Sequence, residues 1–187
     1  SRFADRRGSF CIGSSFWAST SSAATLAAHW FLTGSGEGGF GALGVKDGST
    51  YTGTITIDGA TGATIGGPGG SVTLSGVISG GTLSLGSTSK SNGWNTTTTL
   101  TGANTHASTT VLQGKVIAES ATALGGGLTL TYDTSAAELK AGVTTGFLNG
   151  SDPAGKVTLG TSGSITPAGA TATSSPVFSA VPRPLPP

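Results

Sequence analysis

Few residues of this chain have the type and spacing that covalent catalysis requires. A cysteine nucleophile needs a histidine base held by a third group. No Cys–His–Asn signature surrounds Cys11, the single cysteine of the sequence. A buried or spare thiol is therefore the simpler interpretation, and a single cysteine also excludes an internal disulfide.

The acidic residues are scattered, without DxD spacing or the Gly-Gly-x-Gly-x-Asp repeat of calcium-binding solenoids. Two carboxylates that are distant in sequence can still meet through the fold, as glycoside hydrolysis requires. Nothing in the spacing favours this, so a polysaccharide-active enzyme is only a third hypothesis. We expect no enzymatic activity: no catalytic residue, no cofactor and no metal ion. The acids considered are Asp47, Asp58, Asp133, Glu138 and Asp152.

Asn104 and His106 are the polar residues most suggestive of chemistry, and both lie in an expected turn. A turn asparagine commonly uses its amide to satisfy backbone groups. We interpret Asn104 as a turn or ladder residue, with ligand binding as the alternative. No second histidine is near His106 in sequence, so a metal site is disfavoured.

Gly34, Gly36 and Gly39 form the GxGxxG pattern of dinucleotide-binding loops. That motif acts between a strand and a helix, whereas the residues that follow here are rich in Gly and Thr and do not indicate a helix. We interpret it as a cluster of turns. Residues 63–70, ATIGGPGG, lack the Lys-Ser/Thr of a phosphate loop, and we interpret them as a turn as well.

Composition favours dense β-structure over disorder. Only 9% of the 187 residues are charged and the net charge is +1, whereas disorder pairs low hydrophobicity with high net charge. The lysines are isolated, so nucleic acid is not an expected partner. No run of about 18 apolar residues is present, and we expect no membrane span. The chain lacks Met and begins at Ser1, from which we expect an exported protein.

Short alternating strands recur from Ala42 onward and are joined by glycine-containing turns. Period-2 apolar residues predict one buried face per strand, and no amphipathic helix separates the strands. A sandwich, a barrel or a β-solenoid fits this pattern. We favour the solenoid because its stacked rungs accept columns of Thr, Val and Ile and tolerate few charges. The expected strands are 51–57, 71–74, 76–79, 82–85, 97–100, 109–111, 115–118, 128–132 and 156–159.

The two ends differ from the middle. We expect an N-terminal cap or assembly segment at 1–33, a solenoid at 34–159 and an extended Pro-rich tail at 160–187. Within the first segment, residues 8–19 indicate a strand, and Ser22 is expected to cap a short helix through Leu26. The end rungs of a solenoid expose unpaired backbone, so caps or further subunits must cover them. Candidate assembly residues are Phe10, Phe16, Trp17, Trp30, Val177 and Phe178.

The segment LTGANTHASTTVLQGKV, followed by ALGGG, resembles the autotransporter-associated β-strand repeat of bacterial surface proteins. In that family a Leu-Thr-Gly-Ala-Asn-Thr-Tyr turn precedes Gly, Thr-Thr-Val and a later Ala-Leu-Gly. This chain has His106 in place of Tyr and one residue fewer before Thr109. The resemblance covers roughly residues 34–131 and implies a right-handed parallel β-helix that is exported, surface-exposed and without catalytic residues. The matching structural positions are Leu100, Gly102, Asn104, Thr109, Thr110, Val111, Gly114, Leu124 and Gly125.

Two functions from different classes follow. The first is an extracellular structural protein of the bacterial cell surface that stacks head-to-tail with copies of itself into a filament. The second is an adhesin or passenger-type module that binds glycans or surfaces on a Thr/Asn-lined face, with an exposed Trp94 or Tyr132 patch.

Overall fold

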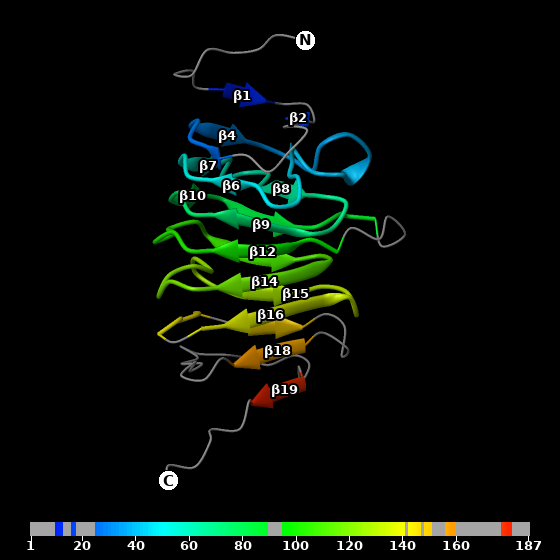
Figure 1. The fold of residues 1–187 in the computed structure, drawn as a ribbon, viewed down its shortest axis with the longest axis vertical. Coiled ribbons are helices and arrows are strands. Elements are labelled where there is room, and N and C mark those ends of the chain that lie inside the picture. The colour runs from blue at the N-terminus through cyan, green and yellow to red at the C-terminus, as the bar shows by residue number, and fades with distance from the viewer. Residues whose placement is uncertain are drawn as a thin grey trace.

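The chain forms a β-solenoid, in which short parallel strands are stacked rung on rung along one long axis (Figure 1). The computed structural model describes residues 10–12, 16–17, 25–89, 95–140, 142–146, 148–150, 156–159 and 177–180. Every strand pairing among these residues is parallel, and their one helical turn is the 3-10 segment η1 (Glu37–Gly39). The predicted fold class is confirmed. The right hand implied by the family resemblance stays a prediction.

Three sheets form the sides of the solenoid. Sheet A has four strands: β1 (Phe10–Ile12), β4 (Trp30–Leu32), β7 (Ile55–Ile57) and β10 (Ile78–Gly80). Sheet B has seven: β2 (Phe16–Trp17), β5 (Leu43–Gly44), β8 (Ala63–Gly66), β11 (Thr82–Leu85), β13 (Ser108–Val111), β15 (Leu128–Leu130) and β17 (Leu148–Gly150). Sheet C has eight: β3 (Thr25–Leu26), β6 (Thr50–Tyr51), β9 (Ser71–Leu74), β12 (Thr97–Leu100), β14 (Gly114–Ala118), β16 (Ser135–Leu139), β18 (Lys156–Leu159) and β19 (Val177–Ala180).

The path of the chain changes partway along the solenoid. Successive strands first visit sheets A, B and C in turn, from β1 to β12. After β12 the described strands belong to sheets B and C alone, because β10 is the last strand of sheet A. The side that sheet A occupied then continues as bends and turns, starting with residues 101–107.

Alternation within the strands fills the core with matched columns. In sheet C, Leu74, Leu100, Ala118 and Leu139 are successive register partners. Each of these four side chains has 0% of its surface exposed. Burial of a leucine side chain contributes about 1.5–3 kcal/mol, and a rung cannot bury its inner face without the rungs above and below it. In most strands the intervening positions face outward, as the period of two requires.

Several expected strands coincide with observed ones, namely 71–74, 82–85, 97–100 and 156–159. Four expectations are wrong. Residues 63–66, expected within a turn, form β8, and all four are buried. Leu26, expected in a helix, lies in β3, because the pairing of Thr25 with Thr50 overrides local helix propensity. The single strand expected at 51–57 is two strands, β6 and β7, in different sheets, and the single strand expected at 8–19 likewise contains β1 and β2 of different sheets.

The expected boundary between an N-terminal segment and the solenoid does not coincide with a break in the sheets. Strand β4 pairs with β7, and β2 pairs with β5, across that boundary. The described parts of residues 1–33 are thus rungs of the same solenoid. The extended tail expected at 160–187 lies outside the described residues, apart from β19.

Successive rungs approach most closely at a corner occupied by glycine. A Cβ on Gly76 would lie 1.9 Å from the backbone oxygen of Gly53. A Cβ on Gly102 would likewise lie 2.3 Å from the backbone oxygen of Gly76. These contacts are with backbone atoms of the preceding rung, which cannot rotate away as a side chain can. Glycine is required at this corner because of the rung spacing.

We predict that Gly76→Ala lowers the free energy of unfolding by about 3 kcal/mol, because the new methyl group forces adjacent rungs apart. Gly59→Ala is the matched control, since a Cβ at Gly59 would meet nothing within 4 Å. The control should be neutral or stabilising by up to about 1 kcal/mol. Urea unfolding followed by circular dichroism measures both, and equal effects of the two substitutions would contradict this account of the corner.

Candidate functional site

Asn104 links three rungs at the place where sheet A ends. Its Oδ1 accepts a hydrogen bond from the backbone N–H of Ile78 at 2.8 Å, and its Nδ2 donates to the backbone oxygen of Ala123 at 2.8 Å. The side chain is only 2% exposed. Ile78 is the first residue of β10, so the amide of Asn104 occupies the position of the missing next strand. The predicted role, an amide that satisfies backbone groups, is confirmed.

The backbone around Asn104 completes the same edge. Thr105 N–H donates to the oxygen of Ile78 at 2.8 Å, and Ala107 N–H donates to the oxygen of Gly80 at 2.8 Å. Sheet A therefore ends in a set of satisfied hydrogen bonds, although no described strand of that sheet follows β10. Buried backbone groups without partners are costly, which explains a polar side chain inside the solenoid.

His106 is buried beside the same turn, with 2% of its surface exposed. Its Nε2 lies 2.8 Å from Thr109 Oγ1, and that hydroxyl donates to the backbone oxygen of Leu124 at 3.2 Å. If that hydroxyl donates to Leu124, its contact with the histidine ring requires the ring proton on Nε2, because the threonine has one hydroxyl hydrogen. Nδ1 has no hydrogen-bond partner of normal geometry among the described residues.

The environment of His106 keeps the ring neutral. Burial lowers the pKa of His106 from 6.5 to about 4, and a backbone interaction with Ile78 opposes this shift only in part. A buried neutral ring that contacts a threonine hydroxyl serves packing and not proton transfer with solvent. No group of three or more His, Cys, Asp or Glu that could hold a metal ion is present in the described part of the chain.

The residues that match the repeat pattern contribute to rung stacking. Leu100, Val111 and Leu124 are fully buried, whereas Thr110 is half-buried on the outer face of sheet B. Gly114 and Gly125 adopt positive φ, at 82° and 62°, where other residues are strained. Close approach of backbone oxygens also restricts the glycines at 102, 114 and 125.

The described carboxylates are engaged in local contacts. Asp58 Oδ2 accepts hydrogen bonds from Thr61 Oγ1 at 2.6 Å and from the backbone N–H of Thr61 at 3.1 Å, and the side-chain bond is the largest cause of its lowered pKa. Asp47 Oδ1 accepts from the backbone N–H of Ser71 at 2.7 Å. Asp133 is exposed in a turn. Asp152 lies outside the described residues. No paired-acid site is indicated by these contacts.

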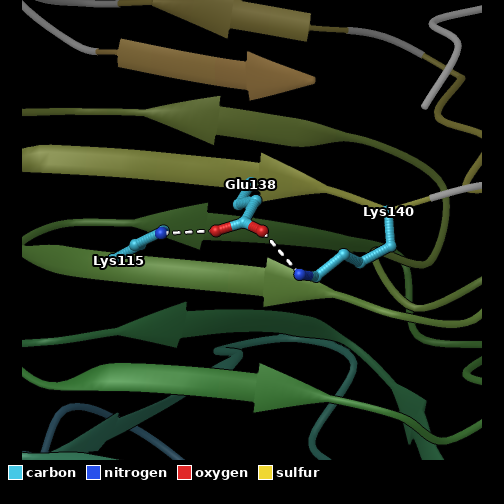
Figure 2. Close-up of polar contacts among 3 residues, drawn as sticks. All are labelled: Lys115, Glu138 and Lys140. Atoms are coloured by element: carbon cyan, nitrogen blue, oxygen red, sulfur yellow. Dashed lines mark hydrogen bonds and ion pairs between the residues drawn. The ribbon is translucent and has the colours of Figure 1, made fainter. Parts of the chain in front are cut away.

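Glu138 lies between two lysines on the outer face of sheet C (Figure 2). Its Oε2 is 2.5 Å from Lys115 Nζ on β14, and its Oε1 is 2.6 Å from Lys140 Nζ. The hydrogen bond from Lys115, followed by that from Lys140, lowers the pKa of Glu138. The cluster joins β14 to β16 across the sheet. Because both lysines are well exposed, solvent screening makes its contribution to stability small.

The proposed assembly residues divide between the core of the solenoid and the terminal strands of its sheets. Trp30 is only 4% exposed and belongs to the core, so the structure does not present it to a neighbouring subunit. Strands β1 and β2 contain Phe10, Phe16, Trp17 and Cys11, and β19 contains Val177 and Phe178. These strands are the terminal ones of their sheets, but the side chains of these residues lie outside the description.

The aromatic patch expected for an adhesin is not seen at Tyr132. Its side chain is half-buried, and its hydroxyl donates to the backbone oxygen of Thr88 at 3.0 Å. Trp94 lies outside the described residues. The GxGxxG segment contains η1 and several glycines with positive φ, and the prediction that it is a cluster of turns is confirmed.

Comparison with known proteins yields no relative: no family model, no curated protein and no solved structure matches this chain. The class of protein is thus defined by its fold, a β-solenoid, and the membership of the autotransporter-associated repeat family stays a prediction. In the described ranges, no helix is long and apolar enough to cross a membrane.

We predict that Asn104→Ala lowers the free energy of unfolding by about 2–4 kcal/mol, because it leaves the Ile78 N–H and the Ala123 oxygen buried without partners. The adjacent exposed residue provides the control: Thr105→Ala should change stability by no more than about 0.5 kcal/mol. Urea unfolding at neutral pH compares the two. An Asn104→Ala protein as stable as the control would show that the amide does not replace the missing strand.

The lowered pKa of His106 predicts a specific pH dependence of stability. Between pH 6.5 and about 4 the unfolded chain binds a proton that the folded chain does not, so stability falls as the pH is lowered through this window. The loss amounts to about 3 kcal/mol at most. The carboxyl pKa values of Asp58 and Glu138 are also lowered. Their contributions to stability are therefore lost at lower pH, as the pH falls below the ordinary pKa of a carboxyl group.

Urea unfolding of the wild type and of His106→Gln at a series of pH values tests this. Any packing cost of the substitution appears as a constant offset near pH 8, whereas removal of the titrating ring flattens the slope between about pH 6.5 and 4. Parallel curves for the two proteins would contradict the assignment of the slope to His106.

Proposed function

We propose that this chain is an exported structural protein of the bacterial cell surface whose solenoids stack head-to-tail into an extracellular filament. The observation that supports this is the arrangement of sheets B and C. Both sheets run through the described solenoid, with β2 and β3 as their terminal strands at one end and β17 and β19 at the other. Strands β2 and β19 are seen near opposite ends of the stack in Figure 1.

The terminal strands have compatible directions. All pairings in sheet C are parallel, from β3 to β19. If β3 of one copy is placed beside β19 of another, the sheet continues in the same direction and with the same inward and outward alternation. Such a contact joins two different surfaces of the subunit and does not close on itself, which produces a filament.

The edge chemistry provides a driving force for this contact. A terminal strand has a row of backbone N–H and C=O groups that can pair with another chain. The addition of a strand to such an edge is a recognised mode of protein association in which main-chain hydrogen bonds supply affinity. Low charge also favours stacking. Because only 9% of the residues are charged, few like charges would come into register between copies.

The polar residues that first suggested chemistry support a structural role. Asn104, His106 and Thr109 are buried in contacts between rungs. Glu138 pairs with Lys115 and Lys140 on the outer face of the solenoid. These groups maintain the stack and are not arranged around a substrate.

A proline scan across β19 tests the assembly directly. Proline cannot donate to a β-ladder, and successive residues of a strand direct their N–H groups to opposite edges. We therefore expect every second proline substitution along the strand to stop filament growth, as measured by electron microscopy and sedimentation. The four substitutions are Val177→Pro, Phe178→Pro, Ser179→Pro and Ala180→Pro. The intervening variants weaken pairing with β18 and provide the matched control.

Thermal unfolding of each variant separates the two effects. The variants that block the outer edge should retain the melting temperature of the wild-type subunit while losing the filaments. A wild-type protein that stays monomeric at high concentration would contradict the proposal, as would filaments that form equally well in all four variants.

A further inference from the structure

The outer face of sheet C has a regular array of hydroxyl side chains over its first four strands. Thr25, Thr50, Thr73 and Thr99 are register partners in successive strands and form one column. Ser71 and Thr97 are partners in a second column, two residues earlier in β9 and β12. We call these six residues the hydroxyl face: Thr25, Thr50, Ser71, Thr73, Thr97 and Thr99.

The hydroxyl face points to solvent. Its members are exposed or half-buried, whereas the residues that alternate with them, such as Val72 and Leu100, are in the core. None of the six hydroxyls has a hydrogen-bond partner among the described residues, and the side-chain hydrogen bonds near sheet C involve Thr52, Ser75 and Lys115 instead. They are therefore available to an external partner.

The spacing of the array is fixed by the backbone. Neighbouring strands lie about 4.8 Å apart, and positions i and i+2 of a strand are about 6.7 Å apart. Threonine is branched at Cβ and its χ1 angle is restricted, so each hydroxyl and methyl group is held in place. The strands of sheet C that carry the later part of the array, β9 and β12, are drawn as adjacent parallel arrows in Figure 1.

The chemistry of the face disfavours most macromolecular partners. Protein interfaces depend on large aromatic or apolar anchors, and the one strongly exposed large apolar side chain of the described chain is Val77, which is outside this array. The six residues include no charge and no aromatic ring. Charged residues follow in the same columns only later, at Lys115 and Glu138.

We propose that the hydroxyl face binds ice. An uncharged lattice of rigid hydroxyl and methyl groups is complementary to a partner that is itself a lattice of water oxygens. Stiff side chains lose little conformational entropy on binding, and the ordered rows can hold water in ice-like positions. This inference goes beyond the proposed function and does not depend on filament formation.

The test is thermal hysteresis of the full chain, measured on a single ice crystal together with the shape of that crystal. The wild type should separate the freezing and melting temperatures and produce a faceted crystal. Thr73→Lys and Thr99→Lys place a charge within the array and should abolish both effects. Thr129→Lys is the matched control, because Thr129 is a half-buried outward residue of sheet B, and it should leave both effects unchanged.

Circular dichroism and melting temperature confirm that each variant is folded, and a double variant Thr73→Val/Thr99→Val tests the array without adding charge. A wild-type protein without hysteresis and with unshaped ice would overturn the proposal. Binding to crystalline cellulose or chitin in the absence of any effect on ice would also overturn it, and so would self-association that Thr73→Lys removes while ice is unaffected. Loss of filaments with retained hysteresis would contradict only the proposed assembly.

Discussion

The in-register parallel pairing of successive rungs is the constraint on which the rest of this structure depends. Each residue of a strand lies above its partner at the interstrand distance. Every strand position therefore becomes a column of side chains, and the neighbours within a column must pack against one another. Leu74, Leu100 and Leu139 form such a column inside sheet C, and Thr50, Thr73 and Thr99 form one outside it. The same pairing sets the glycine corner, where Gly76 approaches the backbone of Gly53.

The constraint also explains why polar groups are buried. Where sheet A ends after β10, its backbone edge still requires partners, and the amide of Asn104 supplies them within the solenoid. His106 and Thr109 pack beside this amide and connect the turn to Leu124. The residues that appeared most reactive in the sequence are thus those that compensate for a change from three sheets to two.

The sequence predicts the fold well where one face of a strand is buried. Residues 71–74 and 82–85 alternate between hydroxyl and apolar side chains, and their strands have the expected bounds. Residues 63–66 are buried on both faces and lead into a Gly-Gly-Pro-Gly-Gly run, so in sequence they resemble part of a turn. Strand β16, Ser-Ala-Ala-Glu-Leu, is rich in small residues and was not expected. Leu26 lies in a sequence that favours a helix, and only pairing with the next rung decides otherwise.

For the candidate site, the sequence indicates the role of Asn104 but not its partners. Ile78 and Ala123 become its neighbours only through the stacking of rungs. The glycine corner and the hydroxyl face were missed for the same reason, although the recurrence of Thr-x-Thr and of single glycines after strands was a signal for both. Columns can be recognised from sequence only when the register between rungs is known.

Fibre diffraction from aligned, concentrated protein tests the central claim most directly, because continuous sheets between subunits impose a single repeat along the fibre. The account predicts a strong reflection near 4.8 Å along the fibre axis, since the strands of sheets B and C lie across the axis along which solenoids stack. A preparation that gives no oriented reflection at this spacing, or gives it only perpendicular to the fibre axis, would contradict the head-to-tail stacking of solenoids.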